Sequence, residues 1–230
     1  MEAVLFDLGN TLVNYYKSEE FEPILSDCVN EVCKYLDDEG LEHDKSGVFG
    51  RAKTFNRERE DLSIYPLSER LVKIFSLDEK ETSQFMNDLQ TRFLSPIFQI
   101  AKPNKEAIEI LKELKNRQYA TALVSNTPWG SPSILWWTEI ERHGLTRYLD
   151  DVVFCVDVGK RKPHPAIFNY ALKRLNKKAS KSIFVGDDPK CDVYGSKKVG
   201  MKPILLNPES DIERSDCIVI NSLKELLKHV

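Results

Sequence analysis

The apolar positions of this chain follow two patterns in two regions. Four apolar residues, Ala3 to Phe6, form a short run that ends at Asp7. The period then changes, and apolar residues from Phe21 to Leu36 recur at steps of three and four, which predicts an amphipathic helix. Further helices are predicted over residues 48–62, 66–75 and 78–94, the last ending before Pro96. We find no strand pattern within this helical stretch.

Helical and strand patterns alternate from Pro103 onward. The predicted strands are residues 120–124, 152–156, 182–185, 203–206 and 217–220, and the predicted helices are 104–116, 132–143, 165–175, 192–199 and 222–228. Such alternation with short links predicts a parallel sheet with helices on both faces. We therefore expect an α/β fold: a Rossmann-like core of residues 1–13 and 97–230, and an inserted α-helical cap of residues 14–96.

Composition narrows the class of protein. The 230 residues carry a net charge of -3, which argues against a nucleic-acid partner and an anionic membrane surface. No segment approaches the roughly 20 apolar residues of a membrane span, and the N-terminal apolar run is too short for a signal peptide. Five cysteines without a CxxC motif do not predict a disulfide framework or a zinc site. We expect a cytoplasmic protein, and the sequence does not indicate its oligomeric state.

Candidate chemistry lies in four short segments. They read FDLGNTL from Phe6, LVSN from Leu123, GKRKPHP from Gly159 and VGDDPKCD from Val185. Three of the four follow predicted strands. Because the carboxyl ends of parallel strands meet at one edge of a sheet, we expect their side chains to gather there.

The residue types in these segments suit phosphoryl transfer. The carboxylate of Asp7 can attack phosphorus, and a hydroxyl and a backbone N–H at Ser125 and Asn126 can bind phosphoryl oxygens. The ammonium of Lys162 can offset the negative charge, although neighbouring bases compete for that role. The fourth segment carries three clustered carboxylates, Asp187, Asp188 and Asp192, which suit Mg²⁺. The alternative for Asp192 is that it merely caps the next helix.

The ordered set resembles the haloacid dehalogenase-like hydrolase superfamily, in its phosphatase branch with a helical cap after the first motif. The resemblance covers nearly the whole chain, and GKRKPHPAIF followed by VGDDPKCDVYGSKKVGM is its most specific part. It implies that Asp7 is the nucleophile, that Ser125 binds the phosphoryl group and that Lys162 neutralises charge. It further implies Mg²⁺ held by Asp7, Asp187 and the backbone carbonyl of Gly9, with Asp188 and Asp192 supporting the ion. We expect Gly9, Asn10 and Asn126 to contact the substrate.

One position departs from the family pattern. Phosphatases of this family usually carry a second Asp two residues after the nucleophile, where this chain has Gly9. General acid–base help of that kind is worth about 10²–10⁴-fold in rate. Three outcomes stay open: another group such as His164 or a cap residue supplies the proton, the substrate has a good leaving group, or the enzyme is slow.

Substrate recognition is expected to come from the cap. Tyr15 and Tyr16 lie just past the nucleophile loop, and Trp129 is expected near the entrance of the site. At least one of the adjacent tryptophans 136 and 137 is expected to pack on the sheet. Basic residues of the second helix form either a side that meets an anionic substrate or a solvated face: Arg51, Lys53, Arg57 and Arg59.

The leading hypothesis is a Mg²⁺-dependent phosphatase that hydrolyses a small phosphorylated metabolite through an aspartyl-phosphate on Asp7. A 2-haloacid dehalogenase also uses a nucleophilic Asp but needs no metal, so the acid-rich loop argues against it. A catalytically weak protein that binds a phosphorylated ligand or a partner is the third possibility. A phospho-receiver is excluded, because receivers carry their acid pair near the N-terminus, whereas the acid pair of this chain lies near the C-terminus.

Overall fold

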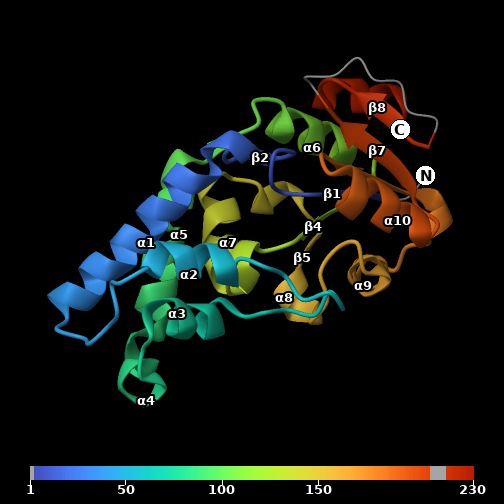
Figure 1. Ribbon diagram of the computed structural model, residues 1–230. Coiled ribbons are helices and arrows are strands. Elements are labelled where there is room, and N and C mark those ends of the chain that lie inside the picture. Colours follow the sequence, from blue (N-terminus) through green and yellow to red (C-terminus); the bar gives the residue numbers. More distant parts are fainter. Residues whose placement is uncertain (1–2, 208–215) are drawn as a thin grey trace.

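A parallel sheet forms the centre of the computed structural model, which describes residues 3–207 and 216–230 (Figure 1). Six strands of the described part pair in the order β5-β4-β1-β6-β7-β8, and every pairing is parallel. In that order the strands are Asp151–Phe154, Ala120–Ser125, Ala3–Phe6, Ser182–Gly186, Lys202–Leu206 and Ile218–Ile220. The predicted α/β class is confirmed.

The register of the central strand decides what meets at the sheet edge. On β1, Phe6 is level with Leu123 of β4 and with Val185 of β6. The backbone N–H of Asp7 continues the ladder by donating to Val185 O at 2.9 Å. The chain therefore leaves the sheet at Asp7 between the ends of β4 and β6, which carry the second and fourth motifs.

Helices cover both faces of the sheet, as the alternation predicted. Val4 and Phe6 of β1 belong to one apolar cluster, together with residues of α6 (Ala107–Asn116) and α7 (Ser133–Arg142). Ala3 and Leu5 point to the other face and share a cluster with α9 (Pro165–Arg174). Successive side chains of a strand point to opposite faces, so a strand buried on both sides is apolar at every position.

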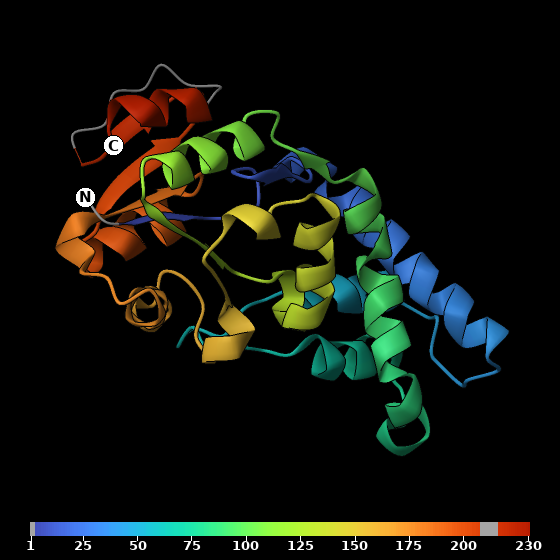
Figure 2. The same ribbon diagram turned by 180° about the vertical axis from the view of Figure 1, so that it is seen from behind.

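A helical insertion separates β1 from β4. It consists of α1 (Phe21–Asp38), α2 (Val48–Phe55), α3 (Leu67–Phe75), α4 (Glu79–Thr82) and α5 (Met86–Ile100). The two long helices α1 and α5 lie along each other and extend away from the sheet in both views (Figures 1 and 2). At its base, β2 (Val13–Asn14) pairs antiparallel with β3 (Lys102–Pro103).

Two helices of the insertion differ from their predicted bounds. The second ends at Phe55 instead of residue 62, and a loop leads from there to α3. The fourth is divided into α4, a 3₁₀ turn (Ser83–Phe85) and α5, which continues through Pro96 to Ile100. Proline removes one helical hydrogen bond, but Phe93, Leu94 and Ile97 are all buried around it, and that packing keeps the helix intact.

Several elements of the core differ by smaller amounts. The predicted strand 152–156 ends at Phe154, where α8 (Cys155–Val158) begins. The helix expected over 192–199 starts earlier, as a wide π-type turn (Pro189–Tyr194) that precedes α10 (Gly195–Lys198). The final predicted helix is a 3₁₀ turn (Leu223–Lys228).

Candidate active site

Asp7 and Lys162 form an ion pair at the carboxyl edge of the sheet. The Nζ atom of Lys162 donates to Asp7 Oδ1 at 2.5 Å and to Asp192 Oδ1 at 2.7 Å. The lysine is 2% exposed and Asp7 is 8% exposed. Burial lowers the pKa of Lys162, but the neighbouring Asp192 and Asp7 outweigh burial and raise it above its usual range. The ammonium is therefore charged at neutral pH.

Three carboxylates meet beside this ammonium. Asp7, Asp187 and Asp192 each place an oxygen within 4.8 Å of the other two. Burial, followed by the charges of Asp7 and Asp192, raises the pKa of Asp187 to about 7. Burial also raises the pKa of Asp192. Crowded carboxylates that resist ionisation are the donor set that a divalent cation relieves, so these residues fit Mg²⁺.

Gly186 makes room for one of these carboxylates. A Cβ atom at this position would lie 2.2 Å from Asp192 Oδ2. That oxygen accepts the backbone N–H of Asp188 at 3.0 Å. Asp188, in turn, caps the following turn by accepting from the N–H groups of Lys190 and Cys191. The capping role considered for Asp192 therefore belongs to Asp188, and sequence reasoning missed Gly186, although it lies within the VGDD motif.

The loop after Asp7 turns tightly at Asn10. Its φ of 52° is left-handed, a conformation that Asn adopts more easily than most residues. Its N–H donates to Val13 O at 2.7 Å, and its side chain bonds to Asp187. A Cβ atom at Gly9 would lie 4.0 Å from Asp7 Oδ2 and from the Tyr15 ring, which is ordinary van der Waals contact. Space for a side chain thus exists beside the carboxylate at this position.

The second motif brings Ser125 and Asn126 to the same edge. Ser125 ends β4 and is buried, with its hydroxyl 3.4 Å from the carbonyl of Asn126. The amide of Asn126 holds the backbone of Lys162 from both sides: Oδ1 accepts its N–H at 2.8 Å and Nδ2 donates to its carbonyl at 3.1 Å. The side chain of Asn126 thus positions Lys162. The backbone N–H of Asn126 is left to bind a ligand.

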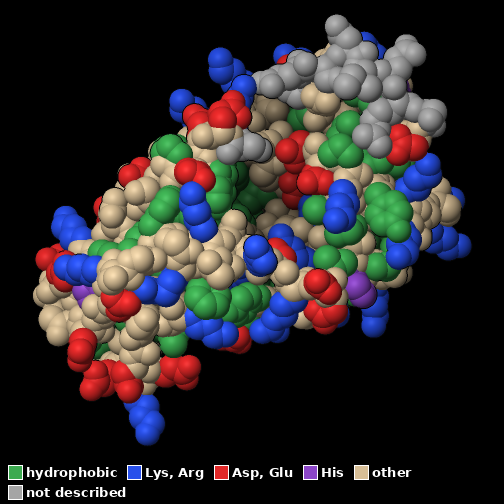
Figure 3. Space-filling model, viewed as in Figure 1, with side chains coloured by type: hydrophobic (Ala, Val, Ile, Leu, Met, Phe, Trp, Pro, Cys, Tyr) green, Lys and Arg blue, Asp and Glu red, His purple; other side chains and the backbone are tan. Residues whose placement is uncertain are grey.

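These residues line a cavity of about 300 Å³ between the sheet edge and the helical insertion. Figure 3 shows the hollow, with acidic side chains at its margin. Aromatic and aliphatic side chains form its apolar wall, and polar and basic side chains complete it. The lining residues are Asp7, Leu8, Gly9, Asn10, Tyr15, Tyr16, Ile97, Ser125, Asn126, Pro128, Trp136, Arg161, Lys162, Asp187, Asp188, Cys191 and Asp192.

The aromatic wall differs in part from expectation. Tyr15 and Tyr16, just past the nucleophile loop, line the cavity, but Trp129, which was expected near its entrance, does not. Trp129 is buried against Phe93 in the insertion, and Trp136 of α7 takes the place at the wall. The Tyr15 hydroxyl is buried without a hydrogen-bond partner among the described residues, and burial raises its pKa above its usual range, so it stays protonated.

Two groups considered for chemistry have other roles. His164 Nδ1 accepts the N–H of Ala166 at 3.1 Å and caps α9, and it is absent from the cavity wall that the structure describes. The basic residues of the second helix pair within the insertion: Arg51 with Asp44, and Lys53 with Glu22. Arg59, in the loop that follows α2, pairs with Glu69 of α3.

The family model for haloacid dehalogenase-like hydrolases matches residues 1–200. This chain belongs to that family. Two similar proteins each match over most of the length of this chain. One is the ribulose-1,5-bisphosphate 5-phosphatase of Halopiger xanaduensis, 26% identical over 93% of this chain and 88% of that protein. The other is the glyceraldehyde 3-phosphate phosphatase of Methanocaldococcus jannaschii, 27% identical over 99% of this chain and 96% of that protein.

Solved structures of haloacid dehalogenase-like hydrolases share the fold. A phosphatase from Thermococcus onnurineus has a TM-score of 0.68 and 25% identity, over 100% of this chain and 97% of its own. A 2-haloacid dehalogenase from Pseudomonas syringae has a TM-score of 0.72 over 99% and 97%, but at 21% identity it shows the fold alone. By the family model the chain is a hydrolase of this family, and the two relatives named above are phosphatases. In the described residues, every helix is too short or too polar to cross a membrane.

Proposed function

We propose that this chain is a Mg²⁺-dependent phosphatase that forms an aspartyl-phosphate on Asp7. One observation carries the proposal. Asp7 lies at the open edge of the sheet with Oδ1 fixed by Lys162, inside a cluster of acids that fits a divalent cation. A carboxylate held in this way is oriented for attack, and the charge that would repel an incoming phosphate is offset.

The roles of the chain's own residues follow from their positions. Because Lys162 binds Oδ1 of Asp7, Oδ2 is the attacking atom, and a new O–P bond forms as the bond to the ester oxygen breaks. The hydroxyl of Ser125 and the backbone N–H of Asn126 hold the transferred phosphoryl oxygens. Water then attacks the phosphorus, the bond between Asp7 Oδ2 and phosphorus breaks, and inorganic phosphate leaves as the Asp7 carboxylate is regenerated.

A bound Mg²⁺ would be held by Asp7, Asp187 and the carbonyl of Gly9, and would neutralise charge on the phosphoryl oxygens. Asp192 and Asp188 support this arrangement from behind. Asp192 receives the second bond of Lys162, and Asp188 donates its N–H to Asp192.

Gly9, His164 and Tyr15 do not supply a general acid for the leaving group. Gly9 carries no side chain, His164 caps a helix, and the pKa of Tyr15 is raised, so none of them serves as a ready proton donor. We therefore propose that the enzyme favours substrates whose leaving oxygen is already weakly basic, or draws the proton from water. The rate should depend steeply on the pKa of the leaving group.

The substrate class is a small phosphorylated metabolite. A cavity of about 300 Å³ is at the small end of ligand pockets. Relatives that act on ribulose 1,5-bisphosphate and glyceraldehyde 3-phosphate support the same class. We propose that residues 14–96 form a cap domain that covers the site on a core of residues 1–13 and 97–230.

Phosphate release from a panel of metabolite phosphates, with Mg²⁺ or with chelator, tests the proposal. We expect turnover that needs Mg²⁺ and that Asp7→Asn abolishes. Asp27→Asn is the matched control, because that acid is exposed on α1. A folded protein that binds Mg²⁺ and phosphate without releasing phosphate from any ester would favour the binding-only alternative. Halide release from 2-chloropropionate without metal would favour the dehalogenase.

A further inference from the structure

One cation on the cavity wall takes no part in the chemistry proposed above. Lys162 and Arg161 are the cations among the described lining residues. Lys162 is buried and bonded to two carboxylates. The side chain of Arg161 is 17% exposed, and its ion pair is with Glu58 of the helical insertion. A guanidinium has five N–H donors, so a single carboxylate partner leaves most of them available.

The backbone around Arg161 is fixed by the insertion. Its N–H donates to Leu62 O at 3.0 Å, and Ile64 N–H donates to Gly159 O at 3.3 Å. Lys160 Nζ reaches the carbonyl of Asp61 at 2.9 Å. The loop between α2 and α3 thus lies along residues 159–161, next to the lysine that holds Asp7. These contacts with the insertion hold the backbone of Arg161 at the cavity wall.

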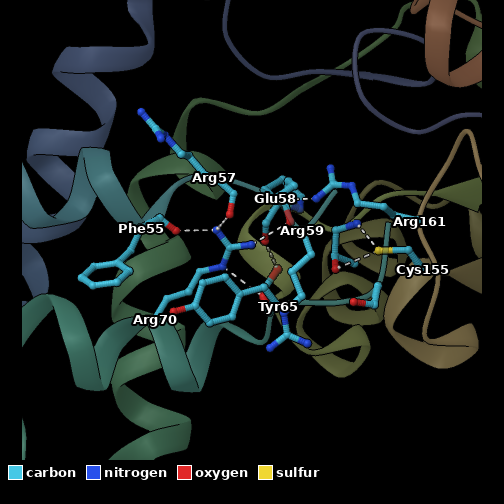
Figure 4. A network of polar contacts seen from close by, with 12 residues as sticks. Phe55, Arg57, Glu58, Arg59, Tyr65, Arg70, Cys155 and Arg161 are labelled. Carbon is cyan, nitrogen blue, oxygen red and sulfur yellow. Dashed lines mark hydrogen bonds and ion pairs between the residues drawn. The ribbon is translucent and has the colours of Figure 1, made fainter. Parts of the chain in front are cut away.

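Glu58 lies between two arginines, which Figure 4 shows. Its Oε1 pairs with Arg161, and its Oε2 accepts from Arg70 Nη2 at 2.7 Å. Arg70 is fully buried and also donates to Phe55 O at 2.6 Å and to Tyr65 O at 3.0 Å. Glu58 therefore remains paired with Arg70 when Arg161 turns away. The Glu58 carboxylate, which is 28% exposed, thus keeps a cationic partner during the exchange at Arg161.

We propose that Arg161 determines specificity by binding a second anionic group, a carboxylate or a second phosphate, on the substrate. This inference rests on the proposed function, because it assigns a binding partner to the end of the substrate opposite the phosphoryl group at Asp7. Arg161 precedes Lys162 in the chain and lines the same small cavity, so both ends of a short substrate reach their partners. A planar guanidinium binds either anion with two parallel hydrogen bonds.

In the structure Glu58 occupies the guanidinium that the substrate anion would bind. Arg161 turns from Glu58 toward the anion, or binds both, while Glu58 stays paired with Arg70. Substrates without a second anion leave the Glu58–Arg161 pair unchanged. Discrimination thus comes from a contact that only doubly anionic substrates make. The competing explanation is that the pair only joins the insertion to the sheet, in which case its loss affects all substrates alike.

Steady-state kinetics of Arg161→Gln on matched substrates separates these explanations. The pairs are 3-phosphoglycerate with glycerol 3-phosphate, and propane-1,3-diol bisphosphate with 3-hydroxypropyl phosphate. We expect kcat/KM to fall by about 10- to 100-fold for the doubly anionic member of a pair, mainly through KM, as for loss of one charged hydrogen bond. The other member should change less than about threefold. Comparing the carboxylate and bisphosphate pairs identifies which anion is preferred.

The matched controls are Lys160→Gln and Arg161→Lys. Lys160 is the adjacent base but is absent from the cavity wall, so its variant should not discriminate within a pair. Arg161→Lys keeps the charge without the planar fork and should recover part of the loss. Equal losses on both members of each pair, or no loss on either, would overturn the assignment of Arg161.

A binding measurement keeps this inference separate from the proposed function. Calorimetry with 3-phosphonopropionate and with propylphosphonate, in Mg²⁺, needs no turnover. We expect Arg161→Gln to weaken binding of the first compound about 10-fold or more and to leave the second unchanged. A native protein without turnover overturns the phosphatase proposal, and the phosphonates then decide the role of Arg161. Native turnover with undiminished phosphonate binding in the variant overturns the role of Arg161 alone.

Discussion

Lys162 holds Asp7 through one carboxylate oxygen, at 2.5 Å, and leaves the other oxygen free of that contact. The same ammonium also binds Asp192 at 2.7 Å. A buried cation shared by two acids orients both, and it can do so only while all three groups keep their charges.

Replacing this lysine by an apolar side chain of similar length should remove activity and weaken the fold. We expect Lys162→Met to lower kcat by about 10²–10³-fold, because the nucleophile loses both orientation and charge compensation. Unfolding in urea with chelator should show a loss of about 3–5 kcal/mol, since buried carboxylates are left unpaired. Lys190→Met, at an exposed position, is the control. Native-like kinetics in Lys162→Met would contradict the role given to the lysine.

The acid cluster predicts how stability depends on pH. The pKa of Asp187 is raised from 3.8 to about 7 in the folded protein, so the folded state binds this proton more tightly than the unfolded state does. In chelator, this group should therefore lower the free energy of unfolding as pH rises from about 4 to 7. Mg²⁺ should stabilise more at pH 8 than at pH 5, which thermal melting measures directly.

Asp187→Asn should remove the contribution of Asp187 to that dependence. Without the third carboxylate, the variant in chelator at pH 8 should melt about 2–4 °C higher than the native chain. It should also lose most of the shift that Mg²⁺ produces. A variant that melts lower than the native chain in chelator, and still responds to Mg²⁺, would show that Asp187 is not part of the crowded cluster.

Gly186 is expected to tolerate no side chain. The methyl group of Gly186→Ala would lie 2.2 Å from Asp192 Oδ2 and would displace the carboxylate that Lys162 binds. We expect a loss of about 1–3 kcal/mol in stability and a marked fall in kcat. Gly50→Ala is the matched control, because no atom lies within 4 Å of its added Cβ, and within α2 it should stabilise by about 0.5–1 kcal/mol. Equal behaviour of the two variants would contradict the packing argument.

Restoring an acid beside Asp7 should help poor leaving groups. A Cβ at Gly9 would lie 4.0 Å from both Asp7 Oδ2 and the Tyr15 ring, so the first side-chain atom of Gly9→Asp displaces neither. We expect kcat on alkyl phosphates to rise about 10-fold or more, while p-nitrophenyl phosphate changes little. Gly9→Asn provides the same size without the proton. A similar rise with Asn, or a similar change on both esters, would show that the effect is not proton donation.

Local pattern predicted the residues at the strand ends. Asp7, Ser125 and Asp187 each follow or end an apolar run, and parallel pairing brings such positions together, so topology alone placed them at one edge. The Lys162 ammonium could be ranked above its neighbours only through the joint arrangement of the four segments. Its contacts with Asp7 and Asp192 join distant parts of the chain, and no local pattern carries them.

Contacts between residues distant in the sequence explain where the structure differs from the prediction. The second helix ends at Phe55, where the buried guanidinium of Arg70 binds the carbonyl of that residue. A carbonyl bound by a side chain fifteen residues later cannot be read from helical periodicity. The wall of the site also depended on packing: Trp129 is drawn into the insertion by Phe93, and Trp136 reaches the cavity instead.

The short pairing of β2 with β3 at the base of the insertion has a consequence for how this protein can diversify. Val13 lies opposite Pro103 and Asn14 opposite Lys102, so the chain returns to the point from which it departed. A segment inserted between these two positions enters and leaves the core at one place, so its length does not alter the strand pairing of the sheet. Substrate range can thus change by exchanging one module, while the residues that handle phosphorus stay where they are.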